Sequence, residues 1–448
     1  MFRKSFDAVV SRLQQLTREL SELLPRRSVR TELPKTAGVS AMPPLQIGAR
    51  KVAVPIVQGG MGVGISLSGL AAAVAEAGGI GVIAANGIGL IEKDYYRDGR
   101  AANVRAFRRE IRTAKAQTDG AIGVNIMVAV NDFHDLLNVA IEEQVDCVFM
   151  GAGLPIKNLP VQQMREAGVA AVPIVSSVRA TEMIFRMWRK IYGRVPDAVV
   201  FEGPMAGGHL GFAPEEIDKE EFQLEAIVPA IVSAVKPFEE AFGRAIPVIA
   251  GGGVFTGEDV HRVIDLGAAG VQMGTRFVAT DECDAHRSFK EAYVSAGPGD
   301  IGLIKSPVGM PGRAIRNDFI RDAEEGRRPA FRCAWQCLSS CKADDARYCI
   351  SIALNNARLG RLRQGFVFAG TNADKVTEIV PVATLIANLA SEYAATARDA
   401  VSCRLSNLVD RVEAMWREYH SAAPQRAKAL RGQIVAAVAE SWRMVLAA

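Results

Sequence analysis

Short apolar segments alternate with amphipathic segments along residues 52–274 of the chain. The apolar segments have the length of buried strands, whereas the segments between them repeat apolar residues at helical spacing. The eight apolar segments lie at 52–58, 79–85, 121–127, 147–152, 170–176, 198–202, 246–250 and 270–274. Helical spacing is clearest at 67–78, 103–118, 132–145, 179–193 and 258–268. Because strands buried on both faces are apolar throughout, this alternation predicts a parallel sheet covered by helices.

The number of these units favours an α/β fold that closes into a (β/α)8 TIM barrel. Eight strand–helix units over about 240 residues match such a barrel in count and in size, with an open doubly wound sheet as the alternative. The predicted division is an N-terminal helical extension (1–45), the barrel (46–320), a cysteine-containing segment (321–375) and a helical C-terminal region (376–448).

The two terminal regions are predicted to be helical. The first twenty residues are amphipathic and mix acids with bases, and they lack the apolar core of a signal peptide. From residue 382 onward the chain is rich in alanine, with apolar faces at helical spacing that can cover the barrel or another subunit. No apolar run reaches the ~18 residues of a membrane span. We therefore expect a cytoplasmic protein without a membrane partner, and homo-oligomer formation stays open.

Composition narrows the class of partner. The 448 residues are 49% hydrophobic and 23% charged, and the net charge of +4 is spread along the chain. No long basic stripe interleaved with aromatic residues occurs, so no nucleic-acid partner is expected. A small-molecule substrate is expected instead.

Two glycine-rich loops are candidates for binding a phosphate group. In TIM barrels phosphate usually binds to the loops after strands seven and eight, which here read AGGGVFTGEDV (250–260) and QMGTRF (272–277). Three consecutive glycines let backbone N–H groups approach an anion, and Thr256 can cap the following helix, whose N-terminus favours negative charge. Glycines and small polar residues also follow the other strands, which suits a planar cofactor.

One histidine stands apart from the others. His209 lies in the glycine-rich stretch EGPMAGGHLGF that follows the sixth predicted strand. An imidazole exchanges a proton near neutral pH, so His209 is the candidate catalytic residue, although it can also serve only to pin the loop. The remaining histidines lie in helical segments among charged residues and are read as surface side chains: His134, His261, His286 and His420.

With these residues assembled, the chain resembles the flavin-dependent nitronate monooxygenase family, formerly called 2-nitropropane dioxygenases. That family also contains flavin-dependent enoyl-acyl carrier protein reductases. The resemblance covers residues 50–320 and rests on six stretches in the family's order: PIVQGGMG, GVNIM, AGGHLG, PVIAGGGV, GVQMGTRF and SPVGMPGRAIRN. It implies an oxidoreductase, a flavoprotein that binds FMN in the barrel, with His209 as the catalytic histidine.

The resemblance also implies where FMN binds. Residues 60–62 would face the isoalloxazine ring, Asn125 its polar edge, and residues 272–275 the phosphate. The sequence departs from the family at Glu202, where glutamine is usual, and at Met205, where glutamate is usual, which leaves the substrate open. The full candidate set for the cofactor is Gly60, Met61, Gly62, Asn125, Glu202, Gly207, Gly208, Gly251, Gly252, Gln272, Met273, Gly274 and Thr275.

Two redox activities fit this resemblance. Nitronate monooxygenase activity, the oxidation of alkyl nitronates with O2, is the leading expectation, with His209 as a base or as a cationic partner. The alternative is an enoyl-thioester reductase that uses NAD(P)H, whose acyl carrier protein partner would meet Lys305, Arg313 and Arg316. A phosphate-binding TIM-barrel isomerase is the alternative from another class.

Four of the seven cysteines gather in CAWQCLSSCKADDARYC, residues 333–349. On a continuous helix the first and third would lie about 12 Å apart at ~1.5 Å per residue. Sulfurs bound to one zinc lie within ~4 Å of each other, so one metal cannot take all four unless the segment is unwound. A metal or iron–sulfur site that feeds electrons to FMN, and buried reduced thiols, both stay open. The candidate ligands are Cys333, Cys337, Cys341 and Cys349.

Overall fold

The structure, a computed structural model, describes residues 2–20, 42–327, 331, 333, 335–339 and 341–447. The chain divides into two compact units. One comprises Met1–Met42 with Leu389–Ala448, and the other comprises Pro43–Asn388.

The larger unit contains a closed barrel of parallel strands, as the alternating pattern predicts. The strands hydrogen-bond in the ring order β10-β11-β3-β4-β5-β6-β7-β8, so the open doubly wound sheet is ruled out. Each of the eight predicted apolar segments supplies one strand of the ring. These strands are β3 (Ile56–Gln58), β4 (Ile80–Ala84), β5 (Ala121–Met127), β6 (Cys147–Gly151), β7 (Ala170–Val175), β8 (Val199–Glu202), β10 (Val248–Gly251) and β11 (Gly270–Met273).

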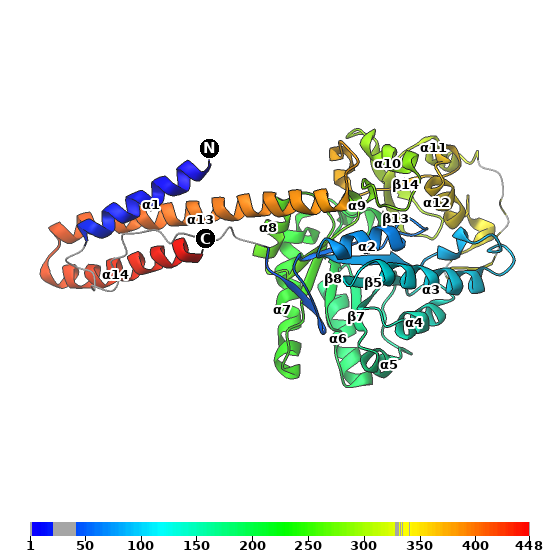
Figure 1. Ribbon diagram of the computed structural model, residues 1–448, viewed down its shortest axis with the longest axis horizontal. Coiled ribbons are helices and arrows are strands. Elements are labelled where there is room, and N and C mark those ends of the chain that lie inside the picture. Colours follow the sequence, from blue (N-terminus) through cyan, green and yellow to red (C-terminus); the bar gives the residue numbers. More distant parts are fainter. Residues whose placement is uncertain are drawn as a thin grey trace. The chain divides into compact units, whose positions relative to one another are not determined.

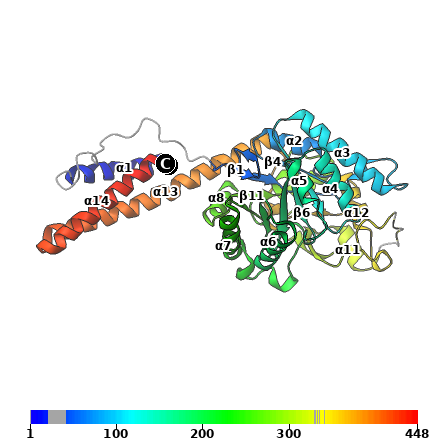
Figure 2. The same cartoon turned by 90° about the horizontal axis from the view of Figure 1, so that it is seen from below.

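Helices enclose the strands, as Figures 1 and 2 show. α6 illustrates why they form: Ser177 caps its start by accepting a hydrogen bond from the Ala180 N–H, and Gly193 ends it in the left-handed conformation. Its apolar face, which includes Trp188, is buried. The helices that follow the strands are α2 (Ser68–Glu76), α3 (Gly99–Gln117), α4 (Phe133–Glu142), α5 (Val161–Glu166), α6 (Val178–Tyr192), α7 (Leu224–Phe242), α8 (Gly257–Asp265) and α9 (Thr275–Val278).

A hairpin of β1 (Leu45–Ile47) and β2 (Arg50–Val52) precedes the barrel. Its residues Leu45, Ile47 and Val52 belong to the same buried cluster as residues that begin the barrel strands, such as Ile80 and Ala121. The hairpin therefore covers the amino-terminal end of the barrel core. The predicted strand at 52–58 is consequently two strands, separated at a proline, which has no N–H for a sheet ladder.

A second, antiparallel sheet was not predicted from the sequence. It joins β12 (Ile301–Lys305), β13 (Pro311–Ile315) and β14 (Val367–Phe368), and β13 also pairs with β9 (Gly208–His209). This sheet thus ties the loop after β8 to residues about a hundred positions later. The remaining elements of this unit are α10 (Arg287–Val294), α11 (Asp318–Glu324), α12 (Ile350–Arg358), η1 (Ile88–Ile91), η2 (Pro214–Glu216), η3 (Glu220–Phe222), η4 (Ala343–Asp345), η5 (Leu362–Gln364) and η6 (Thr371–Lys375).

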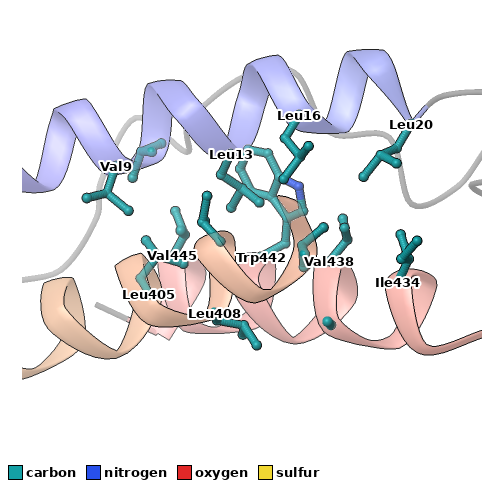
Figure 3. Close-up of a cluster of buried hydrophobic side chains, with 14 residues drawn as sticks. Val9, Leu13, Leu16, Leu20, Leu405, Leu408, Ile434, Val438, Trp442 and Val445 are labelled. Carbon is teal, nitrogen blue, oxygen red and sulfur yellow. The ribbon is translucent and has the colours of Figure 1, made fainter. Parts of the chain in front are cut away.

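The smaller unit is helical, as expected for both terminal regions. Apolar side chains of α1 (Phe2–Glu19), α13 (Val382–Ser421) and α14 (Pro424–Ala447) form one buried cluster, shown in Figure 3. Within it the indole N–H of Trp442 donates to the Thr17 hydroxyl at 3.1 Å. Among the helices of the described residues, none is both long and apolar enough to cross a membrane.

Candidate active site

A cavity of about 510 Å³ lies at the carboxyl ends of the barrel strands. Its volume is in the range of small-molecule and cofactor sites. Every residue proposed above for the cofactor and for catalysis lines this one cavity. The tertiary structure thus gathers side chains that are up to about 215 positions apart, because the carboxyl ends of parallel strands meet at one rim of the barrel.

The loop after β3 forms a fixed, nearly bare wall of the cavity. The buried Gln58 side chain donates to the Gly59 carbonyl and accepts from the Val82 N–H at 2.9 Å, and this pair of bonds anchors the loop. A Cβ atom on Gly60 would lie 2.3 Å from the Cβ of Asn125, so residue 60 has to be glycine. Since no side chain intervenes, a planar ring can approach this backbone closely.

The loops after β10 and β11 lie side by side, since Gly251 pairs with Gln272. Gly252 and Gly253 have φ values of 89° and 94°, a left-handed conformation that favours glycine. A Cβ on Gly252 would lie 2.7 Å from the Gly203 carbonyl oxygen. Successive glycines in this conformation can turn backbone N–H groups toward an anion, as in known phosphate-binding loops.

Thr256 does cap α8, accepting a hydrogen bond from the Asp259 N–H at 3.1 Å. The Asp259 carboxylate in turn accepts from the backbone N–H groups of Phe255 and Thr256, at 2.9 and 3.0 Å. The Asp259 carboxylate therefore already accepts the hydrogen bonds of backbone N–H groups at the amino-terminal end of α8. Any phosphate in this cavity must rely on the glycine-rich turns instead.

His209 is held in β9, rather than in a free loop, by its pairing with Gly312 of β13. Its Nε2 atom lies 2.7 Å from the Ser306 hydroxyl oxygen, and its ring meets Phe368 edge-on with centroids 5.0 Å apart. Burial lowers the pKa of His209 to about 4. The imidazole is therefore neutral at neutral pH, and the expected role as a cationic partner for a nitronate is not supported.

Glu202 ends β8 and is the acid that departs from the family pattern. No hydrogen bond from another described residue reaches its carboxyl group. Burial raises its pKa to about 7, so a large share of the carboxyl is protonated at neutral pH. Among the described residues that line the cavity, none is lysine or arginine. The pocket is therefore close to neutral.

Arg313 does not belong to a basic docking surface. It is only 5% exposed, and its guanidinium donates to the backbone carbonyls of Pro204 and Ala206, the second at 2.8 Å. Arg316 forms an ion pair with Glu324 at 2.6 Å. Lys305 is exposed and forms no ion pair with another described residue. The prediction that Arg313 contacts an acyl carrier protein is therefore wrong, because Arg313 is buried.

Several site residues had no signal in the sequence. Ser306, which is 2% exposed, bonds His209, and a single serine after a strand is too common to stand out. The segment 369–372 supports the glycine loops from a distant part of the chain. Gly370 N–H donates to the Thr275 hydroxyl at 3.1 Å, and the Asn372 amide donates to the Gly253 carbonyl at 3.0 Å.

This arrangement of glycine-rich turns around a histidine matches a known family. A model of the nitronate monooxygenase family matches residues 44–392. The chain belongs to the nitronate monooxygenase family. Members of this family are flavin-dependent oxidoreductases.

The relatives of the chain carry several different activities. A (3aS,4S,5R,7aS)-5-hydroxy-7a-methyl-1-oxo-octahydro-1H-indene-4-carboxyl-CoA dehydrogenase of Mycobacterium tuberculosis is 30% identical over 274 residues, covering 61% of this chain and 66% of that protein. The match therefore spans slightly less than two thirds of that relative. A nitronate monooxygenase of Pseudomonas aeruginosa is 28% identical over 294 residues, covering 60% of this chain and 78% of the relative.

Solved structures show the same barrel. FabK from Thermotoga maritima is 31% identical, with a TM-score of 0.61, and the match covers 78% of this chain and 95% of FabK. A nitroalkane oxidase from Streptomyces ansochromogenes has the same TM-score of 0.61 at 23% identity, with coverage of 78% and 98%, which bears on the fold alone.

Proposed function

We propose that the flavin of this enzyme is FMN and that the reacting group of its substrate is electrically neutral and acidifies a neighbouring carbon, foremost an acyl thioester. The observation that carries the proposal is the electrostatic neutrality of the cavity. At neutral pH His209 is uncharged and about half of Glu202 is protonated, and the described lining holds no lysine or arginine. A neutral reacting group enters such a pocket without the desolvation cost of an unpaired charge.

The residues present fit FMN. The bare backbone at 59–62 suits the flat ring, Asn125 suits its polar edge, and the glycine turns at 251–253 and 274–275 suit a phosphate. A mononucleotide fits better than a dinucleotide, since one set of phosphate-binding turns lines the described cavity. FMN, when bound, supplies the hydride chemistry of an oxidoreductase.

The side chains of His209 and Glu202 can then transfer a proton to or from the substrate. Ser306 engages Nε2 of His209, so Nδ1 is the ring nitrogen that remains for exchange with a substrate carbon. With a pKa of about 4, His209 is a weak base and its conjugate acid readily gives up a proton. Glu202, with a pKa of about 7, is the group that holds a proton at neutral pH. This combination favours giving a proton to the α-carbon of a reduced enoyl thioester over removing one from a nitroalkane.

Nitronate oxidation with O2 is the second candidate, supported by the relatives that bear the name nitronate monooxygenase. An alkyl nitronate is already an anion and needs no base. It would, however, have to bind without a cationic side chain from the described lining.

One pair of measurements on the purified protein tests these proposals. Under anaerobic conditions, NADPH or NADH should bleach the flavin absorbance, and crotonyl-CoA should restore it. Rapid oxygen uptake with propyl nitronate, together with no bleaching by either nucleotide, would replace the thioester proposal with nitronate oxidation. A protein purified without flavin absorbance that also fails to bind added FMN would contradict the choice of cofactor.

A further inference from the structure

A second cavity, of about 530 Å³, is lined by all four clustered cysteines. Cys333, Cys337, Cys341 and Cys349 are free and partly buried. The described residues between 331 and 342 form no helix, and the first helical turn after them is η4. The rise of a continuous helix therefore does not separate these cysteines, and all four can line the same cavity.

The barrel holds this segment in place. The Asn131 N–H donates to the Cys337 carbonyl at 3.1 Å, and the Ser339 N–H donates to the Ala129 carbonyl at 3.0 Å. The Trp335 indole N–H donates to the Tyr95 hydroxyl at 3.0 Å. These bonds tie both sides of Cys337 to the loop after β5 and to the region before α3. These hydrogen bonds therefore fix the backbone around Cys337 against the barrel.

The four cysteines lie close to one another, because Cys349, Cys333 and Cys341 all contribute to the electrostatic surroundings of Cys337. Cys349 stands at the N-terminal cap of α12.

The described residues hold no group of three or more His, Cys, Asp or Glu side chains arranged for a single metal ion. A larger group that spreads its ligands apart fits this observation.

We propose that Cys333, Cys337, Cys341 and Cys349 bind an iron–sulfur cluster in this cavity. Four thiolates are the usual ligand set of such clusters, whose several irons hold the ligand sulfurs further apart than one ion does. Lys342 lines the cavity, and together with the amino-terminal end of α12 it partly offsets the negative charge of such a cluster.

The two cavities share a wall. Leu338, Ile350 and Ser351 line both, and the Ser351 hydroxyl oxygen lies 3.7 Å from the sulfur of Cys337. A one-electron centre would thus stand beside the flavin cavity. The proposal itself concerns only binding of the cluster and does not depend on the identity of the flavin or the substrate.

The first test uses the full-length wild-type protein, produced with added iron and cysteine and purified without oxygen. We expect iron and acid-labile sulfide in equal amounts, about two to four of each per chain. Dithionite should produce an electron paramagnetic resonance signal of a reduced cluster. Zinc without sulfide, or no iron and sulfide even after reconstitution with ferrous iron and sulfide, would overturn the proposal.

Serine variants locate the cluster. Cys337→Ser and Cys349→Ser should each lower iron and sulfide content at least fivefold, whereas Cys403→Ser, at an exposed position on α13, should leave both unchanged. Flavin content and the far-ultraviolet circular dichroism spectrum report whether each variant folds. Full iron and sulfide content in both folded variants would contradict ligation by these cysteines. If neither variant folds, the wild-type measurement still decides.

Discussion

At the scale of single residues, burial moves two titratable groups toward their uncharged forms. It lowers the pKa of His209 to about 4 and raises that of Glu202 to about 7. In both cases the low-dielectric surroundings penalise the charged form, so one group becomes a weaker base and the other a weaker acid. In the proposed reaction the two groups therefore have different roles in proton transfer, although both line the same cavity.

His209→Ala should leave flavin content unchanged and lower kcat by about 10²–10⁴-fold, the usual loss when a positioned proton-transfer group is removed. The check is steady-state turnover with the substrate identified by the anaerobic tests, beside the absorbance of bound flavin. His134→Ala, at an exposed position on α4, is the matched control and should retain full activity. If His209→Ala is equally active, His209 only pins the loop after β8.

Glu202→Gln should change how stability depends on pH. The pKa of Glu202 is raised from 4.5 to about 7 in the folded protein, so the folded state disfavours the carboxylate. Below about pH 4.5 both states are protonated and nothing is lost, whereas stability is lost as pH rises through about 7. Above that pH, the free energy of unfolding of the variant should exceed that of the wild type by about 3 kcal/mol.

Urea unfolding of both proteins, freed of flavin, on the two sides of this pH window measures the difference. The gain should vanish below about pH 4.5, since neither carboxyl nor amide is then charged. A gain of the same size at both ends of the window would show that packing, rather than ionisation, sets it.

At the scale of elements, the antiparallel sheet determines the shape of the loop that leads to His209. β13 pairs with β9 and so fixes the backbone of His209, while Arg313 of the same strand bonds two carbonyls of the loop between β8 and β9. A buried guanidinium that satisfies two backbone acceptors holds the loop more firmly than an exposed ion pair can. The loop is therefore a rigid part of the site.

Arg313→Met should destabilise the larger unit by about 2–4 kcal/mol, because two buried carbonyls lose charged donors. Since the same loop carries Gly207 and Gly208, flavin affinity should fall at least tenfold. Arg316→Met, which removes a partly exposed ion pair with Glu324, should cost less than about 1 kcal/mol and leave affinity unchanged. Urea unfolding and flavin titration measure both effects, and equal results for the two variants would refute the role of Arg313.

At the scale of the whole molecule, each of the two compact units has a hydrophobic core among its described residues. One fills the barrel, and the other joins α1 with α13 and α14. Residues from the two ends of the chain meet in the helical core, where Trp442 bonds Thr17. Each unit is therefore stabilised by its own core, and a substitution that destabilises one unit need not unfold the other.

Trp442→Ala should destabilise the helical unit by about 3–5 kcal/mol, the usual cost of removing a large buried aromatic side chain. Flavin content and the fluorescence of bound flavin should stay at wild-type values. Limited proteolysis should then cleave within 389–447 while the barrel survives. Arg431→Ala, at an exposed position on α14, should have no effect. Joint loss of flavin and helical structure would show that the two units unfold together.

The barrel and the lining of its cavity were predictable from the sequence because they rest on local patterns. Each strand is an apolar run of the right length, and glycines mark each turn where backbone has to approach a ligand. The antiparallel sheet was not predictable, since β9 and β14 are two residues long and form only by pairing with β13. The proline that divides the first predicted strand was visible, but the hairpin before it was not inferred.

The sequence by itself determined the order of strands and helices, the glycine turns and the one histidine among them, because these depend on neighbouring residues and on the backbone. Only the tertiary structure decided the charge of that histidine, the burial of Arg313 and the gathering of four cysteines around one cavity. Those properties depend on which distant groups displace water from a side chain, and water is excluded only once the chain has folded.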